Sequence, residues 1–222
     1  MSKKHKLNKP FLIFTKITGI LGAVILFKPK IYYVNKERQG RKLHGPCILM
    51  SNHTSLMDFV LYMLVFYDST MHFWMAEILF KKNKLFSWLL YSLGGIKVDR
   101  QQYQLGFISE SLEVLDRGGI LGVFPQGRLP VNGRPFPFQP GIVMTALKTD
   151  APIIPVYTDG NYGIGKGAHV MIGEPIDIHA LCREENPSLE EIKRLTQILE
   201  EQTYALGREL DKRMEQISQH GR

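Results

Sequence analysis

Cysteine is scarce in this chain, which has two in 222 residues. Cys47 and Cys182 are too few to build a disulfide framework, and neither has a companion that completes a metal-ligand pattern. Both are therefore interpreted as ordinary reduced thiols. Their scarcity argues against a small disulfide-stapled fold and against a cysteine-based zinc module.

The chain also lacks a Gly-x-Ser-x-Gly segment, and no serine or cysteine stands in a motif that marks a catalytic nucleophile. It has no internal repeat, and no linker-like stretch divides it into two domains. With 222 residues, 44% of them apolar, it suits one domain with a sizeable core. Covalent catalysis through a serine or cysteine is therefore not indicated.

No uncharged apolar run reaches the ~20 residues that a clean membrane-spanning helix needs. The apolar segment 10–27 is interrupted by Lys16, which leaves only about eleven residues uncharged. Asn8 and Pro10 before it and Lys28 after it are helix start and stop signals. Basic residues at both ends favour a helix that lies in the membrane plane or inserts shallowly, with a true span and a soluble core helix as alternatives. The segment offers no small-residue cleavage site, so a signal peptide is not indicated.

Positive charge is concentrated at the start of the chain. Residues 1–42 contain eleven Lys or Arg and a single acid, Glu37, a net charge of +10. Because the whole chain carries +7, the remaining 180 residues have a net charge of −3. Nucleic-acid binders more often carry basic residues on the folded domain. Basic residues that flank an apolar segment instead favour an anionic membrane surface, so no nucleic-acid partner is expected.

From residue 31 onward, short apolar runs alternate with segments of helical periodicity. This alternation predicts an α/β fold with a largely parallel central sheet. The predicted strands are 31–34, 47–50, 71–75, 96–98, 120–124, 153–157 and 169–172. The predicted helices are 56–67, 85–93, 103–115, 141–148 and an amphipathic C-terminal helix at about 188–217, where Ser188 and Glu191 form a capping box.

The polar turn 51–58 lies between two apolar runs and contains a histidine and an aspartate five residues apart. If a helix begins near Ser55, capped by Thr54 or Ser55, then Asp58 lies in its first turn and can fold back toward His53. The carboxylate would accept the proton of one imidazole nitrogen and leave the other as a general base. The alternative is a turn in which His53 and Asp58 have only structural roles.

Two arginines each follow a predicted strand. Arg100 follows the strand that ends at Val98, and Arg128 lies in a loop rich in Pro and Gly after the strand that ends at Phe124. Ligand sites in open α/β sheets lie beyond the carboxyl ends of the strands. Since a guanidinium group binds phosphate through a planar fork, both arginines are candidates for a phosphate-bearing substrate, although either alone could be a surface ion-pair partner.

Four segments occur in a distinctive order along the chain. They are Asn52-His53 with Asp58, then Gly95-Ile96-Lys97-Val98-Asp99-Arg100, then Phe124-Pro125-Gln126-Gly127-Arg128, then Ile154-Pro155-Val156. Together they resemble the four blocks of the glycerolipid acyltransferase family that includes the 1-acylglycerol-3-phosphate (lysophosphatidic acid) acyltransferases. The resemblance covers roughly residues 30–175.

The resemblance implies an acyltransferase-type α/β domain over 31–222, with its core at 31–180. It implies catalysis by His53 and Asp58, and binding of an acceptor phosphate around Arg100, Gly127 and Arg128. The expected reaction moves a fatty acyl group from a thioester donor, acyl-CoA or acyl carrier protein, to the hydroxyl of a lysophospholipid. It requires no cofactor or metal. Residues 1–30 would associate with the cytoplasmic face of a membrane, as in a monotopic protein.

The third block departs from the family, which usually has Phe-Pro-Glu-Gly where this chain has Gln126. Glutamine keeps an acceptor oxygen but loses the negative charge and adds two donors. We therefore expect Gln126 to contribute to the substrate site, with 1-acylglycerol-3-phosphate as the leading acceptor. A different lysolipid, a lipid-binding pseudoenzyme and a hydrolase that needs no acceptor remain alternatives.

Overall fold

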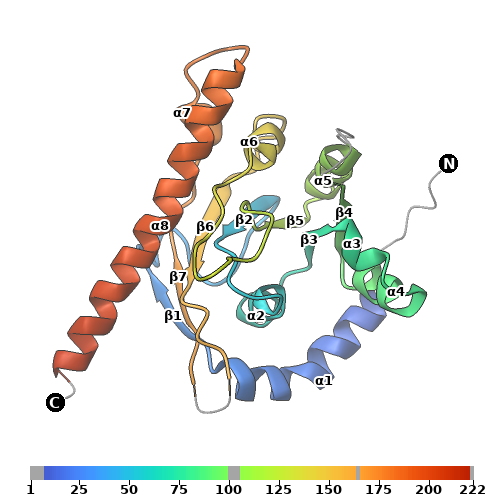
Figure 1. Cartoon of the computed structure of the whole chain (residues 1–222), viewed down its shortest axis with the longest axis vertical. Helices are drawn as coiled ribbons and strands as arrows, with labels where there is room; N and C mark the ends of the chain where they lie inside the picture. Colours follow the sequence, from blue (N-terminus) through green and yellow to red (C-terminus); the bar gives the residue numbers. More distant parts are fainter. Residues whose placement is uncertain (1–7, 100–105, 164–165, 221–222) are drawn as a thin grey trace.

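The computed structural model describes residues 8–99, 106–163 and 166–220 and is built around one seven-stranded sheet (Figure 1). Its strands are β1 (Lys30–Tyr33), β2 (Cys47–Ser51), β3 (Met71–Ala76), β4 (Gly95–Val98), β5 (Ile120–Val123), β6 (Ile153–Thr158) and β7 (His169–Ile172). Their order across the sheet is β1-β7-β6-β2-β5-β3-β4. Of the neighbouring pairs, β6 and β7 are antiparallel and the others parallel, which confirms the predicted α/β fold.

Helices cover both faces of the sheet. They are α1 (Lys9–Phe27), α2 (Asp58–Val65), α3 (Glu77–Phe80), α4 (Lys84–Ser92), α5 (Gly106–Asp116), α6 (Gly141–Ala146), α7 (Ile178–Leu181) and α8 (Leu189–His220). One hydrophobic cluster contains residues of α1, α2 and α4, and a second contains residues of α5, α6 and α8. The sheet is therefore the middle of three layers, with α8 as the long helix that ends at the C-terminus (Figure 1).

Alternating side chains in β2 supply both clusters. Cys47 and Leu49 belong to the cluster under α1 and α2, whereas Ile48 and Met50 belong to the cluster under α5, α6 and α8. All four are buried, as expected for a central strand covered on both faces. Burial of Ile48, Leu49 and Met50 contributes about 1.5–3 kcal/mol each, so the position of β2 is strongly fixed.

The carboxyl ends of three neighbouring strands meet at one edge of the sheet. β2 lies between β5 and β6 and pairs with both in parallel. The residues that follow these three strands begin at Asn52, Phe124 and Asp159. Segments far apart in the sequence are therefore brought together beside the turn that contains His53.

The N-terminal helix has the predicted start and stop. The Asn8 side chain accepts a hydrogen bond from the Phe11 N–H at 3.1 Å, and Pro10 lies in the first turn. Lys28 ends the helix in the left-handed conformation, with φ at 39°. Helix α1 packs against α2 and α4. Within the described ranges, no helix is both long and apolar enough to cross a membrane.

The start of α2 differs from the prediction, whereas α8 begins as predicted but with only part of its expected capping box. Helix α2 begins at Asp58 rather than near Ser55, because the Asp58 carboxylate accepts the N–H groups of Thr54 and Ser55 and holds both residues in a turn. The capping box at α8 is half formed: the Glu191 N–H donates to Ser188 Oγ at 3.2 Å, but the Glu191 carboxylate binds the N–H of Arg183 instead of that of Ser188.

Candidate active site

The turn after β2 is held in place by an asparagine. The Asn52 amide nitrogen donates to the Thr158 carbonyl at 2.9 Å, and the Thr158 N–H donates to the Asn52 side-chain oxygen at 2.9 Å. This double hydrogen bond joins the carboxyl ends of β2 and β6. It fixes the backbone from which the next residue, His53, projects.

His53 and Asp58 are in direct contact. His53 Nδ1 lies 2.7 Å from Asp58 Oδ2, a short distance that fits a charge-assisted hydrogen bond. The Asp58 side chain is fully buried, whereas the His53 side chain is 15% exposed. A buried carboxylate at Nδ1 favours the tautomer in which Nδ1 carries the proton and Nε2 is free to accept one. The predicted pairing of these two side chains is thus present in the structure.

Several donors converge on the Asp58 carboxylate. Oδ2 accepts the N–H groups of Thr54 at 2.7 Å and Ser55 at 3.0 Å, in addition to His53. Oδ1 accepts the Thr54 hydroxyl at 2.9 Å and the Tyr162 hydroxyl at 2.6 Å. Burial by itself raises the pKa of Asp58, but the hydrogen bonds from His53, Ser55 and Tyr162 outweigh it, and the pKa lies below its ordinary value. Asp58 is therefore an ionised acceptor at neutral pH.

The ring of His53 rests on an aromatic platform. It stacks on Phe124, the first residue after β5, with ring centroids 4.4 Å apart and planes 16° from parallel. Phe124 in turn stacks near Phe73 and Tyr62, each 6.0 Å away between centroids. Gly122 leaves room for this stack, since a Cβ there would lie 2.3 Å from the Phe73 ring. The imidazole is thereby held from one side by packing and from its edge by Asp58.

The loop after β5 carries two further predicted residues. The Gly127 N–H donates to the Phe124 carbonyl at 2.9 Å, which closes a tight turn, and Gly127 has a φ of 63° that favours glycine. Arg128 is exposed, and its guanidinium lies 5.4 Å from the centre of the Phe136 ring. Arg100 lies outside the described residues. The roles of Arg100, Gly127 and Arg128 in phosphate binding stay predictions.

Gln126 faces the interior of the protein. Its side chain is 2% exposed, and its Nε2 donates to the Tyr204 hydroxyl of α8 at 3.2 Å. Its Oε1 is buried and has no hydrogen-bond partner among the described residues. The side chain thus connects the loop after β5 to α8. Its predicted contact with substrate stays a prediction, since the visible contact is with the protein itself.

Sequence reasoning missed one polar contact of the site, Tyr162. It lies 104 residues from Asp58, in the Gly-rich turn that follows β6, so no local pattern connects the two. Its position just beyond the carboxyl end of a strand next to β2 was the available signal. Gly160 in the same turn has a φ of 69°, and a Cβ there would lie 2.7 Å from Thr54 Oγ1. This close approach keeps the turn packed on the His53 segment.

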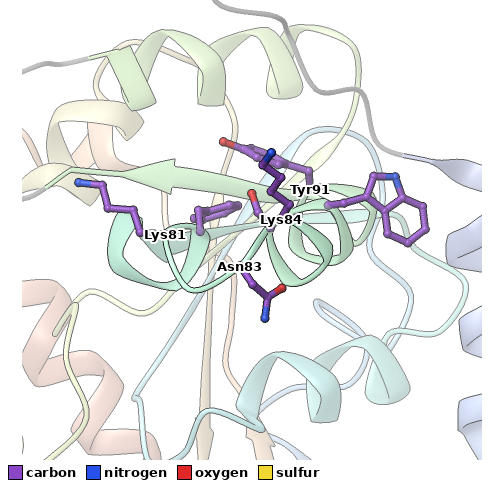
Figure 2. A pocket seen from close by; sticks show the side chains of 7 residues that line it. Lys81, Asn83, Lys84 and Tyr91 are labelled. Atoms are coloured by element: carbon purple, nitrogen blue, oxygen red, sulfur yellow. The ribbon is translucent and has the colours of Figure 1, made fainter.

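An open depression of about 390 Å³ lies elsewhere, on α3, α4 and the turn between them (Figure 2). It is lined by Phe80, Lys81, Asn83, Lys84, Ser87, Trp88 and Tyr91. It contains neither His53 nor Asp58, so it is distinct from the pair. Among the described residues, no group of three or more His, Cys, Asp or Glu side chains could hold a metal ion.

The sequence around this histidine–aspartate pair, which lies at the carboxyl end of a central parallel strand, matches a known family. Residues 30–159 match the family model described as Acyltransferase, and this match covers more than half of the chain. The chain belongs to the acyltransferase family. The resemblance noted in the four sequence blocks is thereby confirmed at the level of the family.

Named relatives in this acyltransferase family are distant. The chain is 26% identical over 113 residues to a chloroplastic 1-acyl-sn-glycerol-3-phosphate acyltransferase of Brassica napus, covering 50% of this chain and 32% of that protein. It therefore spans about a third of the length of that relative. It is 25% identical over 169 residues to a 1-acyl-sn-glycerol-3-phosphate acyltransferase of Bacillus subtilis, covering 74% of this chain and 82% of that protein.

A solved acyltransferase structure has the same fold. The crystal structure of the 1-acyl-sn-glycerophosphate (LPA) acyltransferase PlsC from Thermotoga maritima matches with a TM-score of 0.60 and 23% sequence identity. The match covers 93% of this chain and 84% of that one. It therefore extends over nearly the whole chain, including regions outside residues 30–159.

Proposed function

We propose that this chain transfers a fatty acyl group from a thioester donor to the free hydroxyl of 1-acylglycerol-3-phosphate, giving phosphatidic acid. The observation that carries the proposal is the contact of 2.7 Å between His53 Nδ1 and the buried Asp58 carboxylate. Membership of the acyltransferase family supports acyl transfer, and the names of the distant relatives support this acceptor.

The chemistry assigned to the pair is general base and then general acid catalysis. His53 Nε2 takes the proton of the acceptor hydroxyl while the hydroxyl oxygen attacks the thioester carbonyl carbon. The tetrahedral intermediate collapses by breaking the C–S bond, and the departing thiolate takes the proton from His53. Asp58 keeps the proton of Nδ1 in place and stabilises the imidazolium between these steps, without itself taking up a proton.

Base catalysis of this kind accounts for about 10²–10⁴-fold of rate enhancement. The remainder must come from holding the two substrates together and from donors that face the developing oxyanion. We assign the acceptor phosphate to the arginines of the second and third sequence blocks, Arg100 and Arg128. Exposed Arg128 is held beside the Phe136 ring, so its fork is partly oriented before substrate arrives.

We also propose that one face of the protein lies on a membrane that contains anionic lipid. Ile13 and Val24 of α1 are exposed and eleven residues apart, which places them on the same side of the helix. Leu85 and Trp88 of α4 are exposed too, and Trp88 lies 4.9 Å from Phe11 of α1 between ring centroids. Exposed apolar residues on two adjacent helices favour a lipid surface.

Charge supports the same orientation. Lys84 lines the depression on α3 and α4 (Figure 2), and α4 contacts α1. Lys81 lines the depression too, but its charge is paired with Glu77 at 3.1 Å. The sequence before α1 adds Lys3, Lys4 and Lys6. Lysines near an anionic membrane each contribute about 1 kcal/mol to binding. A thioester donor in solution and a lipid acceptor in the membrane could then both reach the protein at this interface.

Vesicle flotation tests the proposed membrane face. The double substitution Ile13→Asp/Val24→Asp should reduce binding to vesicles of phosphatidylcholine and phosphatidylglycerol by at least tenfold, because it places two charges on the apolar face. Leu189→Asp is the control, since Leu189 is also apolar and exposed but begins α8. Equal binding of the wild type and the double variant would contradict this orientation.

The acyl-transfer proposal is tested by mass spectrometry of membranes that contain the full chain. They are offered acyl-CoA or acyl carrier protein as donor and a panel of lysolipids as acceptor, with Asp58→Asn as the inactive control. We expect phosphatidic acid to be the main product and to be absent with Asp58→Asn. A main product from another lysolipid would overturn 1-acylglycerol-3-phosphate as the proposed acceptor. The absence of product with every combination of donor and acceptor would overturn the proposed enzymatic function.

A further inference from the structure

Tyr162 contacts the catalytic pair but has no step in the proposed mechanism. Its hydroxyl lies 2.6 Å from Asp58 Oδ1 and 3.5 Å from the hydroxyls of Thr54 and Thr158. Asp58 Oδ2 faces His53, so Tyr162 binds the oxygen on the other side of the carboxylate. A hydrogen bond from a tyrosine at this place can fix the rotation of the Asp58 carboxylate about its Cβ–Cγ bond.

The direction of this hydrogen bond is fixed by the charges of its partners. Burial, together with the nearby negative charge of Asp58, raises the pKa of the Tyr162 phenol. The phenol therefore stays protonated, and an ionised carboxylate can only accept. Tyr162 is thus a permanent donor to Asp58 over the whole range of neutral pH.

The other side of Tyr162 is tied to the last turn of α1. Its ring meets the fully buried ring of Phe27 edge-on, with centroids 5.1 Å apart and planes at 83°. The Gly163 N–H donates to the Leu26 carbonyl at 3.1 Å, and the Ala168 N–H donates to the Phe27 carbonyl at 2.7 Å. In Figure 1 the connection between β6 and β7 runs down beside the end of α1.

We propose that Tyr162 is a positioning residue that orients Asp58 toward His53 and links the catalytic pair to the C-terminal end of α1. The proposal rests on the proposed acyl-transfer function for its kinetic consequences. Through Phe27 and Tyr162, the helix assigned to the membrane face is one side chain away from the carboxylate. A shift of the end of α1 would therefore act on Asp58 through the Tyr162 hydroxyl.

The kinetic test compares two tyrosine-to-phenylalanine variants of the full chain. Tyr162→Phe keeps the ring against Phe27 and removes only the donor, so kcat should fall about tenfold while both KM values stay within about twofold, since a hydrogen bond to a charged group is lost. Tyr157→Phe is the matched control, because Tyr157 packs on Gly207 of α8. Its kcat should stay within twofold. An unchanged kcat for Tyr162→Phe, or an equal fall for Tyr157→Phe, would overturn the proposal.

A second readout does not depend on acyl transfer. The Nδ1 proton of a histidine bonded to a carboxylate gives a strongly downfield proton NMR signal. The signal of His53 is assigned by its loss in His53→Gln, because His169 forms a similar pair with Asp159. In Tyr162→Phe the His53 signal should move, and in Tyr157→Phe it should not. An unmoved signal contradicts the positioning role even if the wild type proves to have no acyltransferase activity.

The link to α1 is tested by a double-mutant cycle. Phe27→Leu should lower kcat. The kcat of the double variant Phe27→Leu/Tyr162→Phe should stay within about twofold of that of Tyr162→Phe, because both changes act through the hydrogen bond from the Tyr162 hydroxyl to Asp58. Phe138→Leu, a buried phenylalanine that packs near Tyr204 instead, serves as the control for a lost core contact. Effects that multiply fully in the double variant would overturn the link while leaving the role of Tyr162 at Asp58 intact.

Discussion

Two histidine–aspartate pairs of nearly the same geometry occur in this molecule. His53 Nδ1 lies 2.7 Å from Asp58 Oδ2, and His169 Nδ1 lies 2.7 Å from Asp159 Oδ2. The two histidine side chains are similarly exposed, at 15% and 13%. Judged only by distance and exposure, both pairs could act as a general base with its orienting carboxylate.

The surroundings of the two pairs differ. Asp58 is fully buried and accepts bonds from two backbone N–H groups and two hydroxyls besides His53, whereas Asp159 is 26% exposed and otherwise accepts two backbone N–H groups. His169 Nε2 is buried and has no partner among the described residues, so a substrate cannot reach it without a rearrangement. His53 also lies at the carboxyl end of a central strand, whereas His169 begins β7, next to the edge strand β1.

A short His–Asp distance is therefore not enough to single out His53 and Asp58 as the proposed catalytic pair. What distinguishes His53 is the dense set of donors that keeps Asp58 charged and fixed, together with its place between β5 and β6. The second pair instead joins the two ends of the connection between β6 and β7. That connection also contains Tyr162, which donates to Asp58 Oδ1.

Replacing each histidine by alanine gives the largest expected contrast. His53→Ala should lower kcat by about 10²–10⁴-fold, because the general base is lost. His169→Ala should keep kcat within about tenfold, because its effect passes only through the connection that carries Tyr162. Both are measured as phosphatidic acid formed per unit time, with circular dichroism to confirm folding. A His53→Ala variant that retains a tenth of the wild-type rate would remove the distinction between the pairs.

Two glycines test whether the turn that contains Asp159 supports the site at Asp58. Gly160 and Gly133 have similar φ values, 69° and 72°, but a Cβ at Gly160 would strike Thr54, and one at Gly133 would meet nothing within 4 Å. Both alanine variants should lose about 1–2 kcal/mol of unfolding free energy from the left-handed backbone, and Gly160→Ala should lose more because its Cβ also strikes Thr54. Only Gly160→Ala should also lower kcat. Equal activities of the two variants would show that Thr54 needs no such close packing.

The smallest expected effect is on the pH dependence of stability, measured as the difference in Tm between the wild type and Asp58→Asn. Because the pKa of Asp58 is lower in the folded protein than its unfolded value of about 3.9, its charge stabilises the fold above that pH. This contribution is lost as the pH falls through the folded pKa. The difference in Tm between wild type and Asp58→Asn should therefore shrink below about pH 4. A difference that stays constant down to pH 2 would mean that Asp58 is not held as an ionised acceptor.

The sequence predicted the parts of the site that are local. His53 and Asp58 are five residues apart in one turn, and the strands that carry the site have clear apolar runs. Tyr162 could not be paired with Asp58 in advance, because their contact depends on how the turn after β6 folds. The inward orientation of the Gln126 side chain could not be predicted either, since loop residues follow no periodicity and the contact with Tyr204 depends on where α8 packs.

The start of α2 shows how a local prediction can be right in its contact and wrong in its boundary. Thr54 and Ser55 are common N-cap residues, yet their N–H groups are bound by Asp58, and the helix begins three residues beyond Ser55. The Asp58 carboxylate organises the turn in place of the usual cap. Competition of this kind between a site and a helix end cannot be read from residue preferences alone.

The most direct test of direct acyl transfer is to measure the thiol released from the donor and the phosphatidic acid formed by the wild-type chain in the same reaction, with and without 1-acylglycerol-3-phosphate. General base catalysis by His53 predicts one thiol per phosphatidic acid and no thiol without the acceptor. Release of thiol without the acceptor, as a burst or at a steady rate, would indicate an acyl-enzyme or a hydrolase and would contradict the account.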